Sequence, residues 1–260
     1  MSRADLSSLP LTAFEDVAAL SARRSARWRP GLAHSEGLAL HNEVFASSRD
    51  GGGAAAALAL ALDDWRCLPR DGTGDAQDLR SVLWVQTREA ARRTGRPYRA
   101  GLPQELQACL IHVLAEKAED ALFALEEGLR CRDLAFVVGE IAGNPKALDF
   151  TASRRLTLAS EKHGVPLFLV RVDAARDLSS ARMRWDAASM PSPPPRWNAQ
   201  APGSPRWKGE LFRARARAPG EWVLGEEQGS LMVDGAWREA DEAVANWAAG
   251  LRQRYPRRRA

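Results

Sequence analysis

The sequence predicts an α/β domain in which a mostly parallel, twisted sheet is flanked by helices. Three short apolar runs, at 81–86, 134–141 and 166–172, lack strict alternation with polar residues. Segments with helical spacing, at 119–130 and 149–163, separate them. Strands that are apolar on both faces and alternate with helices belong to parallel sheets covered on both sides. We therefore expect a β-α-β-α-β core.

Further elements surround this core. Residues 9–28 have an amphipathic pattern that predicts a helix, and residues 54–65 predict a second helix, which follows three glycines. The apolar run at 109–114 fits either a buried strand or a buried helix. For the helix at 149–163, Asp149 or Thr151 is the expected N-cap, and Gly164 is the residue that ends it.

The composition changes after residue 172. Residues 186–205 contain six prolines, which predicts a flexible, extended excursion. Beyond it, a strictly alternating run at 212–217 and short strands at 221–224 and 230–233 predict a β-meander extension at the sheet edge. A last helix is expected over 237–254. The predicted organisation is an N-terminal helix and linker (1–36), a main domain (37–233), and a C-terminal helix with a basic tail (234–260).

Composition excludes several classes of function. No apolar run approaches the roughly 20 residues of a membrane span, and the acidic N-terminus is unlike a signal peptide, so we expect a cytoplasmic protein without membrane contact. The three cysteines are widely spaced, and the four histidines show no HxH or HExxH pattern, so no metal site or cofactor is expected. Of the 37 basic residues, 33 are arginine, which suits phosphate and base recognition or follows from a GC-rich genome.

The glycine loop has the layout of a P-loop without its chemistry. Gly51, Gly52 and Gly53 lead into a helix, as in nucleotide-binding proteins, where a lysine holds the phosphates and a Ser or Thr holds magnesium. No Gly-Lys dipeptide occurs in the chain, so a Walker A site is absent and we expect no ATPase activity. Glu140, at the position of a Walker B acid, is expected to anchor a loop or a helix N-terminus rather than to catalyse.

Arginine next to tryptophan is the main positive signal. Such pairs on a mobile loop suit binding of single-stranded nucleic acid. Alternatively, the tryptophans pack against the domain and hold the excursion in place. Arg213, Arg215 and Arg217 share one face of the predicted strand, which faces solvent or tracks phosphates. The residues predicted to contact DNA or a protein partner are Arg154, Arg155, Arg182, Arg184, Trp185, Arg196, Trp197, Arg206, Trp207, Arg252, Arg254, Arg257, Arg258 and Arg259.

Several segments occur in a characteristic order and spacing: 38–45, 82–85, 124–141, 148–171, 179–185 and 205–216. In these segments the chain resembles the ImuA family, which comprises RecA- and SulA-related proteins of bacterial inducible-mutagenesis cassettes. The resemblance implies a RecA-like fold with a degenerate P-loop, in which residues 174–205 stand roughly where RecA keeps its second DNA-binding loop.

The resemblance also implies a function. The chain is expected to be a non-catalytic accessory of SOS-induced translesion synthesis after DNA damage. It would assemble or load an ImuB-like inactive Y-family polymerase homologue and an error-prone replicative-type polymerase subunit on damaged DNA. RecA and single-stranded DNA are further candidate partners. Two alternatives remain at this point: a SulA-like inhibitor of the division GTPase, and a cryptic ATPase that depends on Glu140.

Overall fold

A computed structural model of the chain describes residues 40–67, 78, 80–198, 200–215, 219–227 and 230–236. The helices expected at 9–28 and 237–254, the basic tail and Arg217 lie outside the described residues. Within them, the strands form one nine-stranded sheet with the order β3-β2-β4-β5-β1-β6-β7-β8-β9. The strands are β1 (His41–Ala46), β2 (Ser81–Thr87), β3 (Leu110–Ala115), β4 (Leu134–Ala142), β5 (Leu167–Val172), β6 (Met183–Met190), β7 (Arg206–Ala214), β8 (Gly220–Glu227) and β9 (Ser230–Ala236).

The sheet is mixed. Neighbouring strands from β3 to β6 pair in parallel. The pairs from β6 to β9 are antiparallel and form the expected meander at one edge. The predicted α/β class, the mostly parallel core and the meander extension are therefore confirmed, and the run at 109–114 resolves as a strand.

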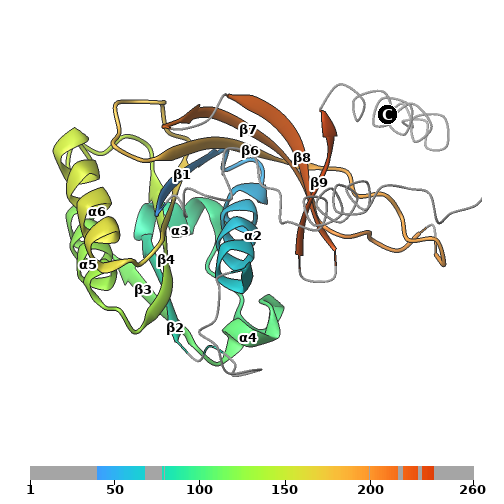
Figure 1. The fold of residues 1–260 in the computed structure, drawn as a ribbon, viewed down its shortest axis with the longest axis horizontal. Coiled ribbons are helices and arrows are strands. Elements are labelled where there is room, and N and C mark those ends of the chain that lie inside the picture. Colours follow the sequence, from blue (N-terminus) through green and yellow to red (C-terminus); the bar gives the residue numbers. More distant parts are fainter. Residues whose placement is uncertain are drawn as a thin grey trace, which may run out of the picture.

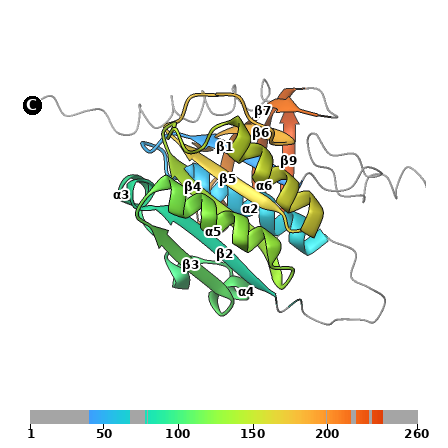
Figure 2. The ribbon, with the colours of Figure 1, turned by 90° about the vertical axis from the view of Figure 1, so that its left-hand side faces the viewer.

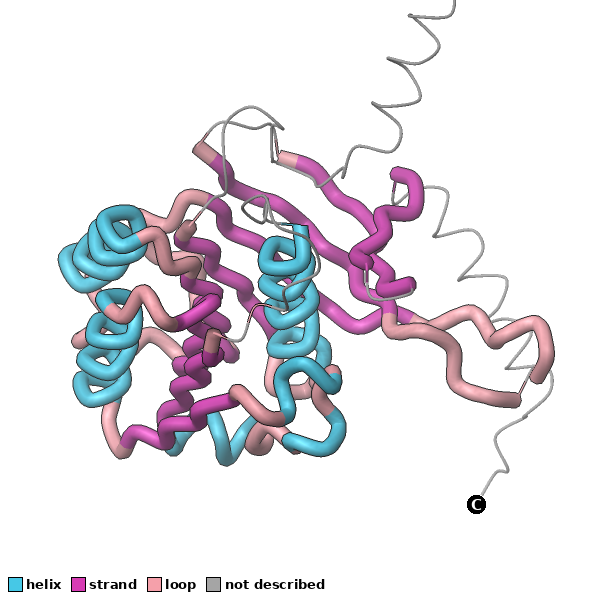
Figure 3. The backbone as a smooth tube through the Cα atoms, turned by 60° about the horizontal axis from the view of Figure 1, so that its bottom comes forward, coloured by secondary structure: helices cyan, strands magenta, loops and turns pink. Residues whose placement is uncertain are grey.

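Helices cover both faces of the parallel part (Figures 1 and 2). One face carries α2 (Gly52–Cys67), and the opposite face carries α5 (Ala118–Arg130) and α6 (Phe150–His163), an arrangement that Figure 3 shows from below. Three shorter helices, α3 (Arg88–Thr94), η2 (Arg99–Gly101) and α4 (Gln104–Gln107), connect β2 to β3.

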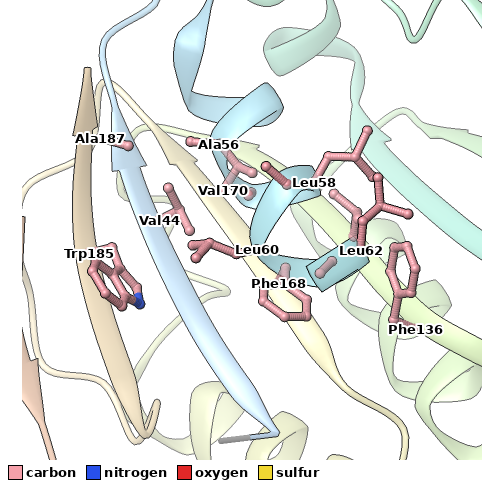
Figure 4. Packing of buried hydrophobic residues seen from close by; sticks show 14 of the residues in the cluster. Val44, Ala56, Leu58, Leu60, Leu62, Phe136, Phe168, Val170, Trp185 and Ala187 are labelled. Atoms are coloured by element: carbon pink, nitrogen blue, oxygen red, sulfur yellow. The ribbon is translucent and has the colours of Figure 1, made fainter. Parts of the chain in front are cut away.

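Each face has its own apolar core. Alanines of α2 allow this helix to lie close to the sheet, where Leu60 packs near Val44, Phe168 and Trp185 (Figure 4). The second core joins α5 and α6 to the inner strands through side chains such as Leu125. Because both faces are covered, polar as well as apolar positions of the central strands are buried.

The ends of α6 follow the expected local rules. The Asp149 carboxylate accepts the Ala152 N–H at 2.7 Å, which satisfies one free donor of the first turn. Gly164 ends the helix with a φ of 73°, in the left-handed region that favours glycine. Asp149, rather than Thr151, is therefore the N-cap.

Several elements differ from the expectation. Neither β1 nor β6 is predicted from the apolar runs, because His41, Glu43 and Arg184 interrupt them although all three are buried. β6 extends to Met190, so the first residues of the predicted excursion at 186–205 are strand. The described part of the excursion after Met190 projects away from the sheet (Figure 3). β7 begins six residues earlier than the predicted strand 212–217 and ends at Ala214.

Candidate partner-binding site

The loop between β1 and α2 has a strand–glycine–helix layout, and several of its backbone donors are already used within the chain. The Ser48 N–H donates to the Asp173 carboxylate at 2.8 Å, and the Asp50 N–H donates to the Ser47 carbonyl at 3.1 Å. The Gly52 N–H, at the first residue of α2, donates to the Asp50 carboxylate at 2.9 Å. A phosphate cradle needs such N–H groups to be directed at the ligand. Here the carboxylates of Asp173 and Asp50 accept the Ser48 and Gly52 N–H groups.

Asp50 is itself held in place by β6. Its carboxylate accepts the Ser189 N–H at 2.6 Å and also bonds to the Ser189 hydroxyl. Burial alone would raise the pKa of Asp50, but the hydrogen bonds from Ser189 and Gly52 outweigh it and lower this pKa below its usual value. An anionic side chain thus lies at the positive end of α2, the place a nucleotide phosphate would need.

Close packing explains the glycines without a phosphate. A Cβ on Gly53 would lie 2.0 Å from the Cβ of Ala46, at the end of β1. A Cβ on Gly52 would lie 2.4 Å from the Ser189 hydroxyl oxygen. Both positions therefore need glycine to bring α2 against the sheet. The adjoining groove of about 340 Å³ is lined largely by apolar residues such as Leu58 and Trp207.

Replacing Asp50 by alanine is expected to lower the free energy of unfolding by about 1–2 kcal/mol, because the first turn of α2 loses its carboxylate partner. Asp50→Asn keeps an acceptor for the Gly52 N–H and is expected to cost less. Urea denaturation of the two variants measures the difference. Equal stability of wild type and Asp50→Ala would show that the carboxylate does not secure the loop.

Glu140 anchors neighbouring elements, but it bonds to a strand and to the C-terminal end of a helix rather than to a loop or a helix N-terminus. It is 1% exposed, accepts the Trp84 indole N–H at 2.6 Å and accepts the Thr94 hydroxyl at 3.0 Å. Burial raises the pKa of this carboxyl, and the hydrogen bond from Trp84 opposes the rise. Glu140 therefore ties β2 and the end of α3 to β4.

A second charged cluster is buried between β1, β5 and β6. Glu43 accepts the Arg184 Nε–H at 2.7 Å and the Ser179 hydroxyl at 2.7 Å, and Arg171 lies 3.7 Å from its carboxylate. Both guanidinium groups also lie over the Phe45 ring, at 5.5 Å for Arg171 and 5.0 Å for Arg184. Such a network fixes the segment before β6 against the sheet.

An open groove of about 590 Å³ lies beside this network, between α6 and the end of β7. Four arginines line it: Arg154 of α6, Arg182 just before β6, and Arg213 and Arg215 at the end of β7. Phe150 and Leu158 of α6 also line it and are 48% and 53% exposed. The groove thus combines guanidinium groups with exposed apolar side chains.

The predicted contact residues do not form one surface. Arg154 and Arg182 meet in the groove, whereas exposed Arg155 lies 3.3 Å from Glu126 of α5. Exposed Arg196 and Trp197 lie in the excursion, and half-buried Arg206 begins β7. The tail residues Arg252, Arg254, Arg257, Arg258 and Arg259 lie outside the described residues.

Three of the residues predicted to contact DNA or a partner are buried, so the prediction is wrong for them. Trp185 is 1% exposed, Trp207 is 4% exposed and Arg184 is 3% exposed. Both tryptophans belong to the apolar core under α2, and the Arg184 guanidinium pairs with Glu43. These side chains stabilise the fold and are not accessible to a partner. The sequence pattern leaves open whether Arg213 and Arg215 face solvent or contact phosphates. In the structure both line the groove.

A buried histidine next to a groove residue is expected to make the free energy of unfolding depend on pH. His41 is fully buried, and its Nδ1 lies 2.7 Å from the hydroxyl of Thr157, a groove residue. Burial lowers the pKa of His41 to about 4, against an attraction from Glu43 that raises it. In the unfolded chain this histidine takes up a proton near pH 6.5, whereas in the folded chain it stays neutral down to about pH 4.

The free energy of unfolding is therefore expected to fall as pH decreases below about 6.5, by roughly 2 kcal/mol between pH 7.5 and 5.0. Urea denaturation at both pH values measures the change. A His41→Gln variant, which cannot titrate, is the control and should lose most of this dependence. The same pH dependence in both proteins would assign it to other groups.

Among the helices of the described residues, none is long and apolar enough to cross a membrane. The same residues contain no group of three or more His, Cys, Asp and Glu side chains placed to hold a metal ion.

The fold and site define an α/β protein whose mixed sheet is covered by helices, with an internally closed glycine loop and an arginine-lined groove. No family model matches the chain. Two curated relatives, both named Protein ImuA and both from Caulobacter vibrioides (strains NA1000 / CB15N and ATCC 19089 / CIP 103742 / CB 15), are each 36% identical over 154 residues. The chain is thus similar to Protein ImuA over this region, in agreement with the resemblance of its motifs.

The match covers 55% of this chain and 59% of each relative, so the chain spans about three fifths of the length of the relatives that it matches. Among solved structures, SulA from Pseudomonas aeruginosa is similar, with a TM-score of 0.32 and 19% identity, over 50% of this chain and 97% of the SulA chain.

Proposed function

We propose that this chain is a non-catalytic accessory protein of SOS-induced translesion DNA synthesis. The observation that carries the proposal is the 154-residue similarity to Protein ImuA. In this role the chain assembles or loads an ImuB-like inactive polymerase homologue and an error-prone polymerase on damaged DNA. RecA and single-stranded DNA are the additional partners that we propose.

The geometry of the glycine loop supports a role without catalysis. We propose that the domain is RecA-like and that its P-loop is degenerate. Asp50 lies at the N-terminus of α2, the loop donors of Ser48 and Gly52 are bonded to carboxylates, and the chain offers no lysine at this loop. Placing a nucleotide phosphate there would set it against the Asp50 carboxylate, a like-charge contact that opposes binding.

Exposed basic residues supply the surfaces that such an accessory needs. Arg154 and Arg182 line the groove, and Arg196 and Trp197 lie exposed in the proline-rich excursion, with Trp197 81% exposed. An exposed tryptophan next to an arginine suits stacking on an unpaired base. We propose that the excursion makes the weak DNA contact and that the groove serves another partner.

A deletion in the bacterium that carries this gene tests the proposal. Ultraviolet-induced mutation to rifampicin resistance is expected to fall to the uninduced background, and a plasmid copy is expected to restore it. Deleting the ImuB-like gene as well should lower the frequency no further. Unchanged induced mutation would contradict the proposal, and filamentation on overexpression would then favour the division-inhibitor alternative.

A further inference from the structure

Four residues of α6 line the arginine-lined groove, Phe150, Arg154, Thr157 and Leu158, and two of them are apolar. Phe150, Arg154 and Leu158 are spaced four residues apart, so they project from the same side of this helix. Phe150 and Leu158 are about half exposed, and roughly 12 Å of helix separates them. Exposed apolar side chains that gather on one surface and are bordered by polar residues mark interaction sites.

The opposite wall of the groove is strongly basic. Arg182 just before β6, Arg213 in β7 and Arg215 just after β7 line it. Arg182 donates to Glu161 at 2.5 Å, so one carboxylate offsets part of this charge. A ligand that fills the groove must therefore bring negative charge to one wall and apolar groups to the other.

We infer that the groove docks an acidic segment of a partner protein that carries two large apolar side chains. The apolar side chains would cover Phe150 and Leu158, and the carboxylates would pair with the arginines, which bind them in a bidentate manner. A nucleic-acid strand fits less well, because it needs aromatic faces for its bases, and the groove offers one phenylalanine and a leucine.

The exposed residues near the groove agree with a protein ligand. Leu178 is 76% exposed and directly precedes Ser179, which lines the groove. Three of the seven exposed large apolar side chains of the described residues therefore belong to this region: Phe150, Leu158 and Leu178. Interfaces are enriched in arginine and aromatic residues, and the groove is lined by four arginines and Phe150.

This inference rests on the proposed function in that it names the chemistry of one partner. A display selection of random peptides of about 12 residues, long enough to reach both apolar positions when extended, tests it on the purified full-length chain. The enriched peptides are expected to carry several acidic residues and two large apolar residues. Binding of an enriched, labelled peptide is then measured by fluorescence anisotropy.

The variants Arg213→Glu and Leu158→Asp are expected to weaken peptide binding by about tenfold or more, since each removes one anchor of the interface. Arg132→Glu and Phe123→Asp make the same chemical changes at exposed positions outside the groove and should bind as wild type does. Circular dichroism and the melting temperature of each variant report whether it is folded.

Three results would overturn the inference: enrichment of no acidic–apolar peptides, equal binding to the groove variants, or displacement of the peptide by oligothymidine at lower concentrations than by unlabelled peptide. The last would assign the groove to nucleic acid. If the protein binds the peptide normally but deletion of its gene leaves induced mutation unchanged, the proposed function is wrong and the groove assignment stands.

Discussion

Replacing Trp185 by alanine is expected to lower the free energy of unfolding by about 3–5 kcal/mol, because the change opens a cavity in the core under α2. Trp185 is 1% exposed, contacts the Trp222 ring edge-on at a centroid distance of 6.3 Å, and lies beside Val44 of β1 (Figure 4). Urea denaturation followed by far-ultraviolet circular dichroism measures the loss.

Trp197→Ala provides the matched control for this prediction. Trp197 is 81% exposed in the excursion, so its removal is expected to change the free energy of unfolding by no more than about 0.5 kcal/mol. If Trp185→Ala were as stable as Trp197→Ala and bound single-stranded DNA more weakly, Trp185 would be a contact residue, as its sequence context suggests, and the core assignment would be wrong.

Replacing Glu43 by glutamine is expected to cost about 3–5 kcal/mol, since it removes the negative charge between two buried guanidinium groups. Glu43 is fully buried, and both Arg171 and Arg184 are at most 3% exposed. After the change, Asp177 is the carboxylate that remains near them, at 3.4 Å from Arg171 and 3.8 Å from Arg184. Chemical denaturation measures this loss too.

A paired substitution separates charge from packing at this site. Glu43→Leu combined with Arg184→Met replaces the closest ion pair by apolar groups of similar size and is expected to cost less than Glu43→Gln alone. A cost of less than about 1 kcal/mol for Glu43→Gln would contradict the view that this network must stay charge-balanced to hold the segment before β6.

The sequence predicts most of the parallel core but not its centre. Apolar runs identify β2, β4 and β5 because their side chains are hydrophobic on both faces. β1 is missed because His41 and Glu43 are polar, and their burial depends on partners such as Thr157 and Arg184, more than one hundred residues away. Such long-range pairs have no local signal in a single sequence.

The site is predicted less well than the fold, for the same reason. Arginine next to tryptophan suggests surface contact, yet Arg184 and Trp185 occupy opposite faces of a strand that is covered on both sides. The groove instead joins Arg154 to Arg182 and Arg213, residues from α6, the segment before β6 and β7 that only the tertiary fold brings together. The amphipathic spacing of Phe150, Arg154 and Leu158 on one helix is the signal that could have indicated it.

We propose that this domain has the layout of a nucleotide-binding loop and works without nucleotide, because Asp50 already occupies the N-terminus of α2. Isothermal titration of the purified chain with magnesium ATP tests this most directly. The account predicts no binding heat and no rise in melting temperature, since a ligand that does not bind the folded state cannot stabilise it. Saturable binding together with a rise in melting temperature would contradict it and place the chain among nucleotide-dependent proteins.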